Sequence, residues 1–100
     1  MTELYAIITG TVQGVSFRDY VQVSAMQLGL TGFVRNNRDG SVAVVAHGLP
    51  DELKQFVEYL NEGSLRSRVE GVSVEWRTAT TLYDDFSIIL QKPVRGIYER

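Results

Sequence analysis

The sequence GTVQGVSFR, residues 10–18, joins an apolar run that is typical of a strand to an amphipathic helix, and it decides the fold. A helix begins with about four backbone N–H groups that have no partner within the helix, and its dipole leaves partial positive charge there. Gly14 lets the backbone approach a ligand closely, and Arg18 adds a planar fork of donors suited to phosphoryl or carboxylate oxygens. The stretch therefore predicts an anion site, with an ordinary capped helix and an exposed arginine as the alternative.

Local signals around this stretch predict where the first helix begins and ends. Ser16 and Asp19 have the spacing of a capping box, which predicts a helix that begins at Ser16. Apolar residues from Phe17 to Leu28 recur at helical spacing, and Gly29 is the expected stop. We therefore expect an amphipathic helix whose apolar stripe packs on a sheet.

The rest of the chain divides into short strands and a second helix. Residues 4–9 are rich in β-branched and aromatic side chains, which favours a central strand buried largely on both faces. Asp39-Gly40 lies between two extended runs and predicts a hairpin turn. The other predicted elements are strands over 32–36 and 41–47, a helix from about Pro50 to 61–63, and strands over 72–76 and 86–90.

The order of these elements is β-α-β-β-α-β with an appended C-terminal strand. It predicts an α+β, ferredoxin-like α/β sandwich, with two helices on one face of a mostly antiparallel sheet. We expect one domain over residues 1–90, with 91–100 as its C-terminal tail, docked through Ile97 and Tyr98 or frayed. The fold alone does not give a function, because it hosts many unrelated ones.

Composition excludes several classes of function. The chain has 100 residues, a net charge of −2 and no cysteine, and its pI is near 5.3. This charge argues against a broad nucleic-acid or membrane surface, and the lack of cysteine rules out a thiolate nucleophile and cysteine-based metal sites. No signal peptide or membrane span is visible, so we expect a cytoplasmic protein, and a monomer.

Two stretches together resemble the signatures of the acylphosphatase family. The first is residues 10–18, in which a glycine and two variable residues precede Gln-Gly-Val, one variable residue and Phe-Arg. The second is Gly32-Phe33-Val34-Arg35-Asn36, followed at the expected gaps by Gly40, Val42 and Gly48. The resemblance covers about residues 4–90. It implies the ferredoxin-like sandwich and hydrolysis of the carboxyl–phosphate bond of small acyl phosphates, to a carboxylate and inorganic phosphate, without metal or cofactor.

The resemblance also implies roles for individual residues. The catalytic residues are Arg18, which binds phosphate, and Asn36, which holds the attacking water. The phosphate-binding loop N–H groups fall on Gln13, Gly14, Val15, Ser16 and Phe17. Positioning and electrostatics suffice for this chemistry, because the carboxylate leaves without being protonated and the transition-state charge lies on phosphoryl oxygens. Inorganic phosphate and other anions are then competitive ligands.

Some positions depart from the family pattern. Phe33 stands where tryptophan is common, and Ala43 and His47 stand where acidic residues are frequent. The chain after Leu90 is longer than is usual in the family, which leaves open what borders the pocket. His47 is expected to be a surface strand residue with no catalytic role.

Other charged residues have weaker signals. Asp84-Asp85 is expected to be a solvated loop and not a cation site. Arg35 and Arg38 flank the hairpin turn, where they are solvated or raise the local potential for anionic substrates. The alternative function is a non-catalytic anion- or carbamoyl-phosphate-binding module on the same fold. RNA binding has poor support, because the basic-aromatic pattern of RNA-binding sheets is missing.

Overall fold

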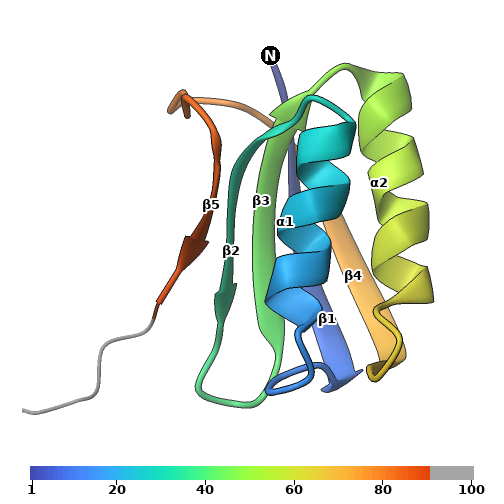
Figure 1. Cartoon of the computed structure of the whole chain (residues 1–100). Helices are drawn as coiled ribbons and strands as arrows, with labels where there is room; N and C mark the ends of the chain where they lie inside the picture. Colours follow the sequence, from blue (N-terminus) through green and yellow to red (C-terminus); the bar gives the residue numbers. More distant parts are fainter. Residues whose placement is uncertain (91–100) are drawn as a thin grey trace, which may run out of the picture.

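The computed structural model describes residues 1–90, which form two helices and five strands (Figure 1). In chain order the elements are β1 (Thr2–Thr11), α1 (Phe17–Gln27), β2 (Thr31–Asn36), β3 (Val42–Gly48), α2 (Pro50–Glu62), β4 (Arg68–Thr78) and β5 (Phe86–Ile89). This order confirms the predicted ferredoxin-like α+β fold with its appended strand. The predicted tail, residues 91–100, lies outside the described residues.

The five strands form one sheet in the order β4-β1-β3-β2-β5. All neighbouring strands are antiparallel except β2 and β5, which run parallel. The middle strand is β3, and it is buried on both faces from Val42 to His47. In β1, only the side chains facing the helices are buried, whereas Tyr5 and Ile7 on the other face are half-buried. The prediction of a central strand buried largely on both faces is therefore met in part: β1 is an interior strand between β4 and β3, but the middle place and burial on both faces belong to β3.

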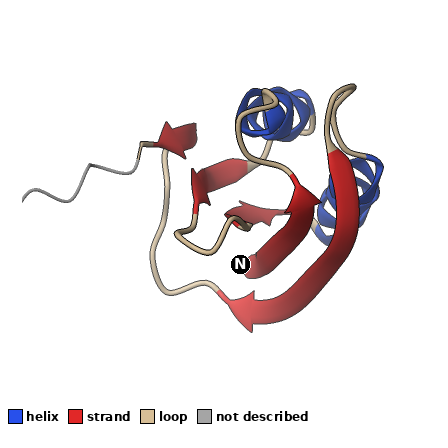
Figure 2. Ribbon diagram, turned by 90° about the horizontal axis from the view of Figure 1, so that it is seen from below, coloured by secondary structure: helices blue, strands red, loops and turns tan. Residues whose placement is uncertain are grey.

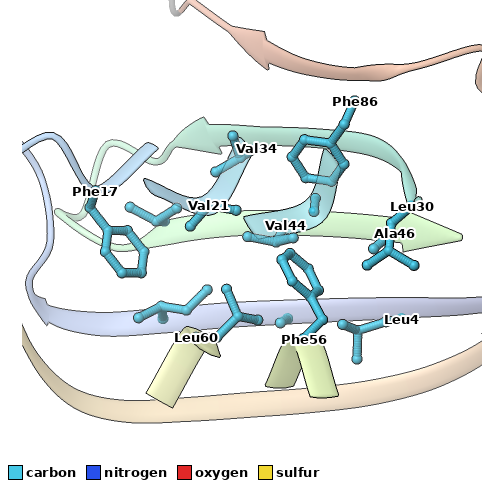
Figure 3. Close-up of a cluster of buried hydrophobic side chains, with 14 of the residues drawn as sticks. Leu4, Phe17, Val21, Leu30, Val34, Val44, Ala46, Phe56, Leu60 and Phe86 are labelled. Atoms are coloured by element: carbon cyan, nitrogen blue, oxygen red, sulfur yellow. The ribbon is translucent and has the colours of Figure 1, made fainter. Parts of the chain in front are cut away.

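Both helices cover one face of the curved sheet (Figure 2). Each carries an apolar stripe at helical spacing, which is the pattern that predicted it. The stripes and the strands beneath them form a single core (Figure 3), with Phe17, Val21, Ala25, Leu53, Phe56 and Leu60 on the helices and Leu4, Ile8, Val34, Val44 and Phe86 among the strand residues. Within residues 1–90, neither helix is long and apolar enough to cross a membrane.

The face of the sheet away from the helices carries a polar and aromatic cluster. His47 is only 1% exposed, and its Nε2 lies 2.8 Å from Oε1 of Glu3 on β1. The ring of Tyr83, from the β4–β5 loop, packs 5.1 Å from the His47 ring and 5.7 Å from that of Phe33. The expectation of a surface histidine is therefore wrong, because the long β4–β5 loop brings Tyr83 against this part of the sheet.

Candidate active site

The loop between β1 and α1 bends sharply and leads directly into Arg18. Gly14 and Ser16 both adopt left-handed backbone conformations, with φ of +74° and +60°. Alternation of left-handed and ordinary residues turns successive N–H groups toward one concave side, which forms an anion-binding nest. Arg18 follows in the first turn of α1, where further N–H groups are free. The loop and Arg18 can therefore hold one phosphoryl group between them.

Ser16 precedes the helix but does not form the predicted capping box. It occupies the N-cap position without a side-chain hydrogen bond to the helix. Its φ of +60° departs from the extended backbone that ordinary N-cap residues adopt. The capping-box prediction is therefore wrong, and the first-turn N–H groups are left to other partners. A non-glycine residue held in this conformation is the kind of strain that clusters at functional sites.

Gln13 connects the loop to the β2–β3 turn through its side chain. Its Nε2 donates to the carbonyl oxygens of Asn37 and Ser41, at 2.8 Å in both cases. The resemblance assigned only the backbone N–H of Gln13 to the site. Its side chain has a second role, which is to hold the loop against the hairpin. No local pattern predicts this bond, because its partners lie 24 and 28 residues further along the chain.

Asn36 is the last residue of β2 and stands on the helix-covered face of the sheet. It pairs in register with Val42, whose side chain belongs to the core. Its Oδ1 is buried and has no hydrogen-bond partner among the described residues. A buried acceptor without a partner costs about 1–3 kcal/mol, so it is ready to accept a hydrogen bond from a small ligand. This atom can hold a water molecule.

The β1–α1 loop and the β2–β3 turn meet at one end of the molecule (Figure 1). Arg18 and Asn36 border two separate hollows there. The Arg18 hollow, of about 490 Å³, is bordered by the loop, by Arg18 and by Ile88 and Leu90. The Asn36 hollow, of about 310 Å³, is bordered by Asn36 and by Ile89. Consecutive residues of β5 and its end thus border both hollows. The structure places Arg18 and Asn36 near the same end of β5.

The β2–β3 turn that follows Asn36 is held by its own hydrogen bonds. The Oδ1 of Asp39 accepts from the Ser41 hydroxyl at 2.6 Å and from the Ser41 N–H at 2.9 Å. These two donors lower the pKa of Asp39 below its ordinary value. The backbone N–H of Asn37 donates to the Ser41 carbonyl at 2.8 Å. The predicted Asp39-Gly40 hairpin is confirmed, and it fixes the segment to which Gln13 is bonded.

The other charged residues that the sequence analysis considered lie in different parts of the structure. Arg35 and Arg38 border the Asn36 hollow and are exposed, so they can raise the potential there. His47 lies five residues after Val42 on β3, about 17 Å from the turn, and is remote from both hollows. Asp84 and Asp85 lie in the exposed β4–β5 loop. Within residues 1–90, no three His, Cys, Asp or Glu residues come together in an arrangement that could hold a metal ion.

Fold and geometry together define a small α+β sandwich with a bent, glycine-containing turn and Arg18 at one end, where Asn36 Oδ1 has no partner within residues 1–90. The acylphosphatase family model matches residues 4–88, so the chain belongs to the acylphosphatase family. An acylphosphatase from Dehalococcoides mccartyi strain CBDB1 is 45% identical over 86 residues, which cover 85% of this chain and 94% of the relative. These findings confirm the predicted family and its class of enzyme, a hydrolase.

Solved structures agree with this assignment. The crystal structure of acylphosphatase from Bacillus subtilis is 38% identical and superposes with a TM-score of 0.86, covering 89% of this chain and 99% of that one. Full-length HypF in its phosphate- and nucleotide-bound form is 29% identical, with a TM-score of 0.77. The match covers 89% of this chain but 12% of HypF. The same fold therefore occurs alone and as a part of a longer protein.

Proposed function

We propose that this chain hydrolyses the carboxyl–phosphate bond of small acyl phosphates by direct attack of water. Arg18 and the backbone N–H groups of residues 13–17 bind the phosphoryl oxygens, and Asn36 orients the water. The observation that carries the proposal is the Oδ1 of Asn36, which is buried without a hydrogen-bond partner among residues 1–90 and lies near the same end of β5 as the bent loop and Arg18. Family membership supports the reaction class.

The proposed reaction requires charge stabilisation more than acid or base groups. In phosphoryl transfer, charge spreads over the three equatorial oxygens while the attacking and leaving oxygens lie roughly in line. Arg18 and the loop N–H groups supply donors for those oxygens, and the bent backbone of the loop brings them to one end of α1. The Oδ1 of Asn36 accepts one hydrogen of the water, and the proton released on attack passes to a phosphoryl oxygen. The acyl carboxylate leaves as an anion.

Turnover of an acyl phosphate tests the proposal directly. Purified protein is mixed with benzoyl phosphate in the presence of a chelator, and loss of substrate and release of inorganic phosphate are followed together. We expect hydrolysis well above the uncatalysed rate and competitive inhibition by added phosphate. A rate equal to the uncatalysed reaction, with folded protein, would refute the proposal.

The second candidate is a non-catalytic module that binds an anion or carbamoyl phosphate. The similarity to a segment that makes up 12% of HypF supports it, because HypF as a whole was solved in a phosphate- and nucleotide-bound form. The two functions use the same loop, and binding alone does not separate them. Saturable phosphate binding without turnover of any acyl phosphate would establish the module, whereas turnover would establish the enzyme.

A further inference from the structure

A third hollow, the interhelix groove, lies between α1 and α2 on the outer side of the molecule. It has a volume of about 720 Å³, within the range of small-molecule sites, and most of its exposed wall area is apolar, although polar and charged residues also border it. Val23 on α1 and Leu65 after α2 border it and are 53% and 101% exposed. Exposed apolar side chains gathered at one hollow favour an apolar ligand.

The floor of the interhelix groove is held in place by hydrogen bonds. The Tyr20 hydroxyl, on α1, donates to the carbonyl oxygen of Tyr59, on α2, at 2.8 Å. Burial, and next the carboxylate of Glu62, raise the pKa of Tyr20, so this donor keeps its proton. Ser64 Oγ donates to the carbonyl oxygen of Val15 at 3.3 Å, which ties the end of the groove to the loop before α1. The groove is therefore a formed feature of the fold.

The interhelix groove lies next to the Arg18 hollow, with which it shares lining residues. Val15 and Ser16, whose backbone N–H groups belong to the proposed phosphate-binding loop, border the groove at one end. Ser16 and Asp19 border both the groove and the Arg18 hollow. A ligand held at the loop is thus next to the interhelix groove.

The geometry of the proposed reaction directs the leaving group toward the groove. Helix α1 packs over β2 and β5, on the side where Asn36 lies, whereas α2 packs over β4 and β3 (Figure 1). The attacking and leaving oxygens must lie roughly in line across the phosphorus. If Asn36 holds the water on the β2 side, the acyl carboxylate points away from β2, toward the side of α1 that faces α2.

We propose that the interhelix groove receives the acyl portion of the substrate and that the enzyme therefore prefers bulky, uncharged apolar or aromatic acyl groups. This inference rests on the proposed hydrolysis at Arg18 and Asn36. The charged residues at the groove are Asp19, Glu62 and Arg66, so its carboxylates outnumber its one arginine. The carboxylate of Asp19 borders both hollows and disfavours acyl groups that carry a second negative charge there.

A substrate series and three exposed positions test this inference. The value of kcat/KM is measured for acetyl phosphate and for 2-naphthoyl phosphate, each divided by the uncatalysed rate constant, and the ratio of the two is the selectivity. Val23→Ser and Leu65→Ser remove apolar contact in the groove. Met26→Ser is the matched control, because Met26 is a 62% exposed residue of α1 that does not border the groove.

We expect the wild-type selectivity to favour the naphthoyl substrate at least tenfold, the order expected for an apolar pocket. Each groove variant should lower it roughly threefold to tenfold, with acetyl phosphate turnover unchanged within about twofold. Met26→Ser should leave it unchanged. Active enzyme whose selectivity is the same in all four proteins would overturn the inference while the proposed function stands. A groove variant that changes only the apparent mass in size-exclusion chromatography would assign the groove to a second copy, and would also overturn it.

Discussion

Arg18 is proposed to act through the shape of its guanidinium group as well as through its charge. Lysine keeps the charge but loses the planar fork that binds two oxygens at once. We therefore expect Arg18→Lys to lower kcat/KM almost as much as Arg18→Ala, by about a hundredfold or more, since losing one preorganised donor typically costs roughly 3 kcal/mol. Arg68→Lys, at the exposed start of β4, is the control. Near-wild-type kinetics in Arg18→Lys would contradict two-point binding.

Asn36 is proposed to act on the water and not on the phosphate. Asn36→Ala removes the buried Oδ1, so we expect kcat for benzoyl phosphate to fall by about a hundredfold, the order of effect of misplacing a reactant. The inhibition constant of phosphate should stay near that of wild type. Asn61→Ala, on the exposed face of α2, should change neither quantity. If phosphate binding is lost together with kcat in Asn36→Ala, the residue has a structural role.

At the scale of the element, the left-handed bend of the β1–α1 loop is the feature that shapes the phosphate-binding loop. A Cβ on Gly14 would meet no atom within 4 Å, so Gly14→Ala disturbs only the backbone preference at φ of +74°. We expect a loss of unfolding free energy of about 1 kcal/mol and a fall in kcat/KM of roughly tenfold or more, as the N–H groups move.

Gly29 offers a matched control for that change. It has nearly the same conformation, φ of +71°, and equally open surroundings, but it ends α1 and lies away from both hollows. Gly29→Ala should therefore show a similar loss of stability in urea unfolding with unchanged kinetics. Equal losses of kcat/KM in the two variants would mean that loop shape has no special role in catalysis.

The β2–β3 hairpin should make stability depend on pH through Asp39. Its pKa is lowered in the folded state by the two Ser41 donors, so the carboxylate stabilises the fold above its ordinary value of 3.8. That contribution is lost as the pH falls below 3.8 toward the folded-state pKa. In urea unfolding, wild type should exceed Asp39→Asn in stability at neutral pH, and the difference should shrink in this acid range. A difference that stays constant down to pH 3 would contradict this linkage.

Most helices, strands and turns are predictable because each depends on residues close together in the sequence. The Asp39-Gly40 turn and the helix that begins at Pro50 depend on a few adjacent residues, and both are confirmed. The prediction of a capping box at Ser16 was wrong, because the residue pattern does not show that Ser16 adopts a left-handed backbone conformation. The two carbonyl partners of Gln13 were also missed, since only the folded chain brings the β2–β3 turn to its side chain.

For the whole molecule, the sequence predicted that both helices cover one face of the sheet. It did not predict that the β4–β5 loop packs against the opposite face. The apolar stripes of the helices can be recognised from the spacing of apolar residues in the sequence. The burial of His47 instead depends on Glu3 from β1 and Tyr83 from the β4–β5 loop, which are far from it in sequence. The expectation that Arg18 and Asn36 belong to one site came from the family resemblance. The structure adds a physical reason, because register places Asn36 on the helix-covered face.

Phe86 connects the core to the candidate site, because it anchors β5, whose end borders both hollows. It is 3% exposed, and its ring meets that of Phe56 at 6.1 Å in an edge-on arrangement. We expect Phe86→Ala to lower the free energy of unfolding by about 3–5 kcal/mol in urea titrations, and to reduce kcat/KM while the protein remains folded, because Ile88 and Leu90 lose their support. Leu82→Ala, at a 76% exposed position in the preceding loop, should change stability by less than about 0.5 kcal/mol. A destabilised Phe86→Ala with wild-type kinetics would show that the Arg18 hollow does not depend on how β5 packs.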